Sequence, residues 1–307
     1  MKKIDQKIPT ISVIMAVYNA QSYLKEAINS ILSQSFHNFE FIIIDDGSTD
    51  SSLKIIKNFS VIDSRIKIIT RENRGLISSL NEGISLAKGI YIARMDADDI
   101  SYPHRLEEQL QHIESMNLDI CGGDYNSIDQ YGKFLYENIM PKNNTEILLT
   151  MASNVPFAHP SVMISKAFIH KNNLTYGMDG HKNAEDLDLW IKIYNAGGKF
   201  GNLNKKILDY RILPFSLSRV THSKIKKEAN EQFNNFVRIH NDKFSKALNE
   251  FCELNNKSRA MERIAAKALM RSLFISFDKS LVYKCFNNLK LSSLILGFFS
   301  FIKSNYF

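Results

Sequence analysis

The sequence GIYIARMDADD (residues 89–99) places an apolar run directly before three carboxylates. The first part has the composition of a buried β-strand, and Asp96, Asp98 and Asp99 follow it within four positions. Carboxylates this close repel one another and lose hydration if the strand ends in a cleft. A divalent cation such as Mg²⁺ or Mn²⁺ would compensate them, because hard cations take oxygen ligands. The alternative is a solvated acidic loop before the helix that Pro103 opens.

Strand-like and helix-like segments alternate through the first part of the chain. Short runs rich in Ile and Val predict buried strands at 11–17, 41–44, 66–69 and 90–95. Between these runs, apolar residues spaced three and four positions apart predict amphipathic helices. Strands separated by helices imply right-handed crossovers and a mostly parallel sheet. We therefore expect an α/β fold, with a Rossmann-like, mostly parallel mixed sheet flanked by helices.

Polar residues follow three of these predicted strands. Tyr18-Asn19 follows the first strand, Asp45-Asp46 the second, and the acidic run the fourth. In parallel sheets of this kind, ligands bind at the carboxyl ends of the strands. We therefore expect the ligand site at this edge of the sheet.

The pattern is less regular after residue 118 and then becomes helical. The residues predict a strand near 120–123, a short helix near 143–152, a helix around 185–190 and a closing strand at 207–210. We expect one domain over 1–220, with a first half at about 10–100 and a second half at about 101–220. Residues 221–307 contain no proline and predict a helical tail.

The net charge of +7 comes from this tail, where 15 Lys/Arg stand against 7 Asp/Glu. No nucleic-acid recognition motif accompanies the basic residues, so we expect no nucleic-acid partner. Residues 291–302, LSSLILGFFSFI, are too few to span a bilayer but suit its interface. We expect the tail to bind the inner membrane surface; a packing or dimerisation helix is the alternative.

Cysteine usage and the N-terminal residues bear on the compartment. The three cysteines, Cys121, Cys252 and Cys285, are far apart in sequence and form no Cys-x-x-Cys pair. This pattern argues against a disulfide framework or a zinc site and fits a reducing cytosol. The first apolar run, at 11–17, is too short for a signal peptide. We expect a cytoplasmic location, and leave open a peripheral attachment to the inner face of the cell membrane.

Six motifs, in this order, resemble family-two glycosyltransferases of the GT-A fold, of the bacterial surface-polysaccharide kind. They are VIMAVYN at 13–19, IDDGSTD at 44–50, RENRG at 71–75, DADD at 96–99, HPSVM at 159–163 and EDLDLW at 185–190. Each could arise by chance, whereas the ordered set is specific. The resemblance covers roughly residues 10–215 and implies a GT-A domain with a C-terminal helical extension.

The resemblance assigns the first three motifs to a nucleotide-sugar donor. Ala16 and Tyr18 would hold the base through backbone contacts and a stacked ring, and Asp45 would accept the imide proton of uracil. Arg71 and Arg74 would bind the diphosphate, for which arginine has the matching fork geometry. The residues alone leave other roles open: an interfacial core tyrosine, a helix-capping aspartate and surface arginines. With the resemblance, we expect a UDP-sugar.

The same resemblance makes the acidic run the family's D-x-D motif. Asp96 would face the ribose and the metal, Asp98 would be the principal metal ligand, and Asp99 would support them. The implied cofactor is Mn²⁺ or Mg²⁺, which would stabilise the leaving diphosphate as a Lewis acid. Many relatives continue the last strand with Tyr-Arg-x-His, whereas Leu213 takes the place of that histidine here. A third protein ligand is therefore undetermined.

The last two motifs would serve the acceptor. The resemblance makes Asp186 the general base of an inverting displacement, with Glu185 orienting the acceptor. Both acids also suit a helix N-terminus, which is the alternative. His159 would contact the diphosphate or the acceptor, or be a buried, hydrogen-bonded histidine. Trp190 would be a core residue or a platform for the acceptor sugar.

Together these features imply a non-processive hexosyl- or N-acetylhexosaminyltransferase. Its acceptor would be a saccharide, lipid-linked or free, of a bacterial surface glycan: O-antigen, lipooligosaccharide or capsule. A processive synthase normally carries Q-x-x-R-W, whereas the only tryptophan here follows Leu189. A sugar nucleotidyltransferase would need a glycine-rich loop at 18–21, which read YNAQ. An inactive sugar- or membrane-binding module would have lost acids that this chain retains.

Overall fold

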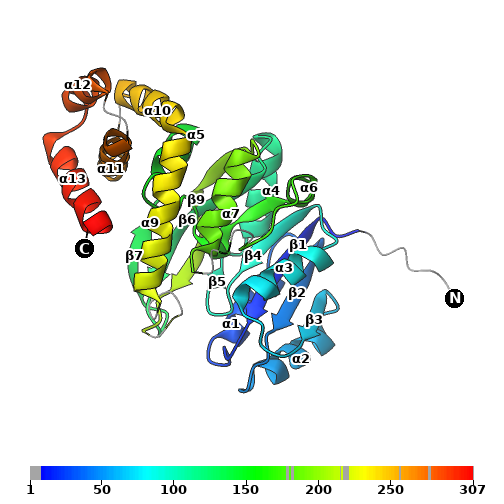
Figure 1. Cartoon of the computed structure of the whole chain (residues 1–307). Helices are drawn as coiled ribbons and strands as arrows, with labels where there is room; N and C mark the ends of the chain where they lie inside the picture. Colours follow the sequence, from blue (N-terminus) through cyan, green and yellow to red (C-terminus); the bar gives the residue numbers. More distant parts are fainter. Residues whose placement is uncertain are drawn as a thin grey trace. The chain divides into compact units, whose positions relative to one another are not determined.

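The computed structural model describes residues 8–177, 180, 183–214, 216, 221–255, 257–275 and 278–306. The chain forms two compact units, which are described separately (Figure 1). The first contains Met1–Met140, Phe157–Gly180 and Lys192–Pro214, and the second contains Pro141–Pro156, His181–Ile191 and Phe215–Phe307. Two segments from before residue 220 thus group with the tail. The division into a domain over 1–220 and a tail over 221–307 stays a prediction.

The first unit begins with four parallel strands. They are β1 (Ile11–Val17), β2 (Phe39–Asp45), β3 (Ile66–Thr70) and β4 (Tyr91–Met95), in the order β3-β2-β1-β4. The helices between them are α1 (Leu24–Leu32), α2 (Ser52–Ile62) and α3 (Leu76–Leu86). This confirms the alternating strands and helices that the Ile- and Val-rich runs predicted.

The rest of the sheet is mixed. Its strands are β5 (Ile100–Ser101), β6 (Ile120–Ile128), β7 (Phe134–Asn138), β8 (Met163–Ser165) and β9 (Phe200–Arg211). They extend the order to β3-β2-β1-β4-β8-β6-β9-β5, and β7 pairs with β6. Only β6 and β9 are parallel; β4–β8, β6–β8, β6–β7 and β5–β9 are antiparallel. The parallel character predicted for the sheet thus belongs mainly to its first four strands.

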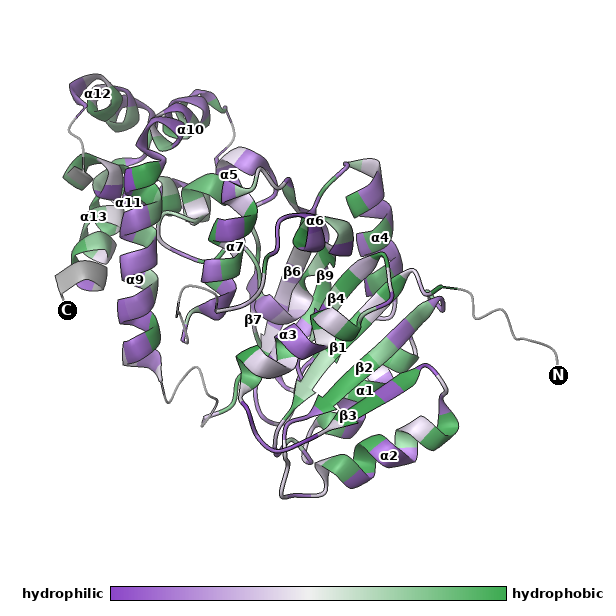
Figure 2. Ribbon diagram, turned by 45° about the vertical axis from the view of Figure 1, so that its right-hand side comes forward, coloured by the Kyte–Doolittle hydropathy of each residue, from purple (hydrophilic) through white to green (hydrophobic). Residues whose placement is uncertain are grey.

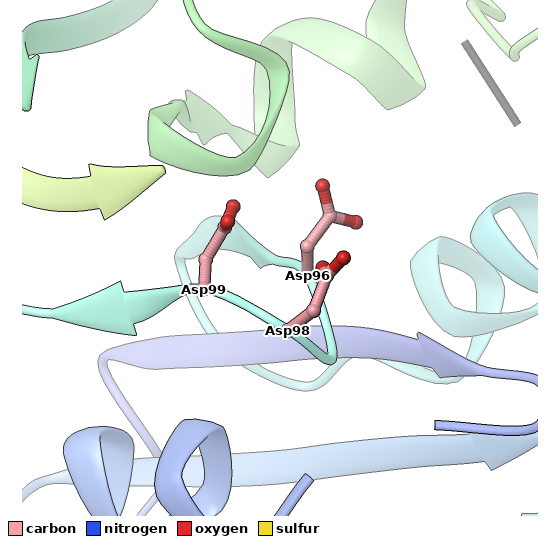
Figure 3. A group of neighbouring side chains, drawn as sticks. All are labelled: Asp96, Asp98 and Asp99. Carbon is pink, nitrogen blue, oxygen red and sulfur yellow. The ribbon is translucent and has the colours of Figure 1, made fainter. Parts of the chain in front are cut away.

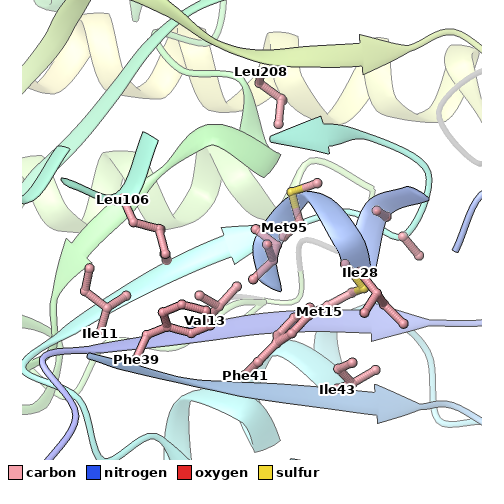
Figure 4. Close-up of a cluster of buried hydrophobic side chains, with 14 of the residues drawn as sticks. Ile11, Val13, Met15, Ile28, Phe39, Phe41, Ile43, Met95, Leu106 and Leu208 are labelled. Carbon is pink, nitrogen blue, oxygen red and sulfur yellow. The ribbon is translucent and has the colours of Figure 1, made fainter. Parts of the chain in front are cut away.

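Helices cover both faces of β1 and β2, which explains why most residues of these two strands are apolar. Met15 of β1 and Ile28 of α1 lie in one buried cluster with Leu106 of α4 (Arg105–Ser115), as Figure 4 shows. Ile14 faces the opposite side, toward α3. There Gly83 permits close packing, because a Cβ atom at this position would lie 2.5 Å from Ile14 Cγ2. Figure 2 shows the resulting hydrophobic (green) residues along β1 and β2.

The second unit is helical, as predicted for the C-terminal region. It contains α5 (Asn144–Thr150), the start of α7 (Glu185–Asn195), α9 (His222–Ile239), α10 (Asn241–Glu253), α11 (Arg259–Ile275), α12 (Lys279–Asn288) and α13 (Leu291–Tyr306). Phe236 and Phe244 join α9 to α10 edge to face, with ring centroids 5.6 Å apart. Within the described ranges, no helix is both long enough and apolar enough to cross a membrane.

Candidate active site

The three acids of the opening motif meet in the loop after β4. One carboxylate oxygen from each of Asp96, Asp98 and Asp99 lies within 4.8 Å of the others (Figure 3). Burial, and then the charge of Asp96, raises the pKa of Asp98 to about 6. The same two causes, in the same order, raise the pKa of Asp99 well above its usual range. The fold thus concentrates negative charge at this point, and the oxygen donors suit a hard divalent cation.

A buried arginine in β4 contacts one acid of this cluster. Arg94 forms an ion pair with Asp96, and its Nε and Nη1 atoms have no hydrogen-bond partner in the described part of the chain. Burial lowers the pKa of Arg94, but Asp96, together with the smaller effects of Tyr176 and Asp99, outweighs burial and the net shift is upward. We did not identify this residue from the sequence. The signal was a charged residue inside an apolar strand, two positions before Asp96 and so on the same face.

His159 opens the short 3₁₀ turn η1 (His159–Ser161) and meets a buried tyrosine. Its Nε2 lies 3.0 Å from the hydroxyl of Tyr176. Asn81 of α3 in turn holds the main chain of Tyr176 through hydrogen bonds of 2.9 and 3.1 Å. Burial, with a smaller effect of Arg94, keeps the pKa of His159 well below its usual value. These contacts favour the hydrogen-bonded histidine; its contact with diphosphate or acceptor stays a prediction.

The end of β2 carries a carboxylate with a spare oxygen. Asp45 is 1% exposed, and its Oδ2 accepts a hydrogen bond of 3.3 Å from Thr70. Its Oδ1 is buried and has no partner among the described residues. Val17 pairs with Asp45 in the parallel ladder, and Tyr18, the next residue, is 54% exposed. Ala16, in β1, is partly exposed. A buried acceptor and an exposed aromatic ring thus occupy adjacent strand ends.

The two arginines predicted for the diphosphate differ in their surroundings. Arg71 bonds to Glu82 at 2.7 Å, to Ser79 at 3.0 Å and, through Nη1, to Asp46. Asp46 also accepts the main-chain N–H of Arg74 at 2.9 Å. Arg71 therefore fixes the 71–75 loop, while the exposed Arg74 side chain makes no ion pair or hydrogen bond within the described residues. Of the two predicted contacts, Arg74 is the better placed to meet an anion.

Three predicted residues belong to α7, in the second unit. Glu185 and Asp186 are half-buried in its first turn, and Asp186 Oδ1 accepts a hydrogen bond of 2.7 Å from the N–H of Leu187. Trp190 is fully buried. An indole without an exposed face offers no platform to a sugar, so the structure favours the core role of Trp190. The catalytic roles of Glu185 and Asp186 stay predictions.

Comparisons with known sequences identify the family of the chain. A family model described as Glycosyl transferase family 2 matches residues 12–173. The O-antigen biosynthesis glycosyltransferase WbnJ of Escherichia coli is 38% identical over 205 residues, which are 66% of this chain and 79% of that protein.

Two solved structures share the fold. TarS 1–349 of Staphylococcus aureus, in complex with UDP-GlcNAc, matches with a TM-score of 0.60 and 19% identity, over 96% of this chain and 81% of that one. The mannosyltransferase PcManGT of Pyrobaculum calidifontis, in complex with GDP-Man and Mn²⁺, matches with a TM-score of 0.56 and 13% identity, over 97% and 88%. These matches confirm the predicted GT-A fold. Their donors carry different bases, so the fold alone does not select the nucleotide.

Proposed function

The chain belongs to glycosyl transferase family 2, and from this premise we propose that it moves one hexosyl or N-acetylhexosaminyl residue from a UDP-sugar to a saccharide, with inversion. The acceptor is a growing bacterial surface glycan, a proposal that the name of the Escherichia coli relative, an O-antigen biosynthesis glycosyltransferase, supports. The observation that carries the proposal is the cluster of Asp96, Asp98 and Asp99 at the end of β4.

The cluster fits a divalent cation, Mn²⁺ or Mg²⁺. Asp98 and Asp96 would hold the ion, and Asp99 would support them from its buried position. When bound, such an ion stabilises the negative charge that develops on a leaving diphosphate. Arg94 neutralises part of the charge on Asp96, and Arg74 offers a cation at the neighbouring loop. The chain's own residues therefore bind and orient the diphosphate end of the donor.

We assign the nucleobase of the donor to a position at the ends of β1 and β2. Tyr18 stacks on the uracil ring. Asp45 Oδ1, which has no other hydrogen-bond donor among the described residues, accepts the imide N–H of uracil. Asp186 then takes the proton of the acceptor hydroxyl as the new C–O bond forms, because a sugar hydroxyl is too weak an acid to ionise first. Glu185 orients that hydroxyl.

The first test measures thermal stability with UDP, GDP, CDP or dTDP, each with and without Mn²⁺. A ligand that binds only the folded protein raises its stability with concentration. We expect UDP with Mn²⁺ to give the largest increase. Asp45→Asn should weaken UDP binding at least about tenfold, because it replaces the imide acceptor by an amide that also donates. Asp242→Asn, in the first turn of α10 and outside the donor motifs, is the control.

Equal stabilisation by all four nucleotides would contradict the uracil assignment. An unchanged affinity for UDP in Asp45→Asn would contradict the role of this residue in particular. If no nucleotide stabilised the protein, the proposed transferase activity would fail, and the inactive-module alternative would gain support.

We also propose that α13 places the enzyme on an anionic membrane surface. One face of this helix packs on α11: Leu294 is buried, and a Cβ atom on Gly297 would lie 2.6 Å from Ala266 Cβ. A second apolar stripe, spaced i, i+4, i+7 and i+8, is exposed and consists of Leu291, Ile295, Phe298 and Phe299. A helix that is apolar on two faces needs a second apolar partner beyond its own unit.

The charges beside this stripe favour a lipid surface as that partner. Lys290 and Lys303 flank the stripe, and residues 221–307 carry a balance of +8 from 15 basic and 7 acidic residues. Apolar side chains enter the interface while nearby lysines attract anionic headgroups. The lipid-linked form of the acceptor would then be within reach of the enzyme.

Flotation of the full chain with vesicles tests this surface. We expect recovery with phosphatidylglycerol-containing vesicles and much less with phosphatidylcholine alone, because the lysines contribute. The triple variant Leu291→Gln/Phe298→Gln/Phe299→Gln should lower recovery several-fold. Val61→Gln/Ile62→Gln, which alters exposed apolar residues of α2, is the matched control. If the triple variant instead halved the mass in solution and kept vesicle binding, the stripe would be an interface between two copies.

A further inference from the structure

Arg211, the last residue of β9, touches the acidic loop with both its main chain and its side chain. Its guanidinium Nε donates to the carbonyl oxygen of Asp98 at 2.8 Å. Its backbone N–H donates to Asp99 Oδ1, also at 2.8 Å. Two consecutive residues of the loop are therefore held by one arginine from a distant part of the sequence.

The other guanidinium nitrogens fasten Arg211 to two further segments. Nη2 pairs with Glu26 of α1 at 2.6 Å, and the guanidinium carbon lies 4.7 Å from the ring centroid of Tyr23. Nη1 donates to the carbonyl oxygens of Asp129 at 3.3 Å and Gln130 at 3.5 Å, in the turn between β6 and β7. The side chain is only 2% exposed. Its planar fork thus links the loop to a helix and a hairpin.

The mode of contact matters for metal binding. Arg211 bonds to the main chain of Asp98 and so restrains the loop without taking a ligand position on its carboxylate. Groups that orient metal ligands in this way strongly affect affinity.

We propose that Arg211 is a positioning residue that holds the Asp96–Asp99 loop in its metal-binding conformation. The inference rests on the proposed function for the identity of the metal ligands. Lysine cannot replace Arg211, because an ammonium group is a point charge and cannot reach a carbonyl, a carboxylate and a ring at once. The aliphatic side chain of Leu213 has no ligand atom for a metal, which makes the geometry of the acidic loop more important.

Binding of Mn²⁺ to the full chain, followed by the electron paramagnetic resonance signal of free Mn²⁺, tests the proposal. We expect Arg211→Lys and Arg211→Met to weaken binding about 10–100-fold. The matched control is Arg65→Met. Arg65 also bonds to a carboxylate, a carbonyl and a ring, namely Asp63, Leu32 and Phe39, and does not touch the acidic loop. Its loss should leave Mn²⁺ affinity unchanged.

Hydrogen exchange of the metal-free protein gives an independent measurement. The amide hydrogens of residues 96–101 should exchange faster than in wild type in Arg211→Lys, and at the wild-type rate in Arg65→Met. Should Arg211→Met fail to fold, Glu26→Gln is the substitute. It removes the ion pair between Glu26 and the Arg211 guanidinium, at a side chain that is 56% exposed. It should still accelerate exchange and weaken Mn²⁺ binding several-fold.

Failure of this inference differs from failure of the proposed function. Mn²⁺ binding within twofold of wild type in Arg211→Lys, with unchanged exchange, would overturn the positioning role. If the wild-type protein bound no Mn²⁺, the proposed metal site would be wrong; faster exchange in Arg211→Lys would still support the restraint of the loop, and unchanged exchange would refute it.

Discussion

Asp98→Asn is expected to abolish Mn²⁺-dependent UDP binding and to lower sugar transfer on the order of 10³-fold, while it stabilises the metal-free protein. The loss follows because the principal anionic ligand becomes a neutral amide. The gain follows because the substitution removes a charge that burial disfavours and that Asp96 repels within the cluster. Calorimetry of UDP binding with Mn²⁺, and thermal unfolding with a chelator, measure the two effects.

The stabilisation should depend on pH. The pKa of Asp98, about 6 in the folded protein, lies above its ordinary 3.8, so the folded state keeps a proton that the unfolded chain has released. Wild-type stability is therefore penalised above about pH 6, and the penalty fades as pH falls toward 4. The difference in Tm between Asp98→Asn and wild type should shrink over this range when metal is absent.

Asp242→Asn, in the first turn of α10, provides the matched control for Asp98→Asn. It should change neither Mn²⁺-dependent binding nor the pH dependence of stability. Retention of Mn²⁺-dependent UDP binding by Asp98→Asn would contradict the assignment of this residue as the principal ligand. If the difference in Tm between Asp98→Asn and wild type were the same at pH 7.5 and pH 4.5, the stabilisation would not come from the removal of the Asp98 charge.

Asp186→Asn should lower kcat by about 10²–10⁴-fold and leave UDP binding within about twofold of wild type. An amide cannot take the proton of the acceptor hydroxyl, whereas the donor contacts assigned to the first unit are unaffected. The measurement is UDP release from the bound UDP-sugar, with acceptor saccharide present and, as a separate rate, with water alone. Calorimetry gives the affinity for UDP.

Glu185→Gln is the comparison for Asp186→Asn, because it changes the neighbouring acid of the same helical turn. We expect it to raise the KM for the acceptor more than it lowers kcat. If both variants kept kcat within a few-fold of wild type, the two acids would act only as charges at the helix N-terminus, and the base would be another residue.

The first four strands and the helices between them could be predicted from local composition, because β1, β2 and β4 are buried almost throughout. Residues 11–17 and 41–44 are short runs of mostly apolar residues, which local composition reveals. By contrast, β5 and β8 have only 2 and 3 residues, and β7 is largely exposed, so none of them leaves a clear pattern. Their pairing depends on partners far away in the sequence.

By itself the sequence determined the alternating α/β architecture, the family resemblance and the clustering of acids at a strand end. These depend on local runs of residues and on the order of short motifs along the chain. Only the tertiary structure decided the environment of individual charges. It pairs Arg94 with Asp96 and gives the guanidinium of Arg71 acceptors within the protein. It also brings Arg211, 112 positions away in sequence, into hydrogen-bond contact with Asp99. Burial and hydrogen bonding are set by residues that meet through folding, and no local pattern encodes those meetings.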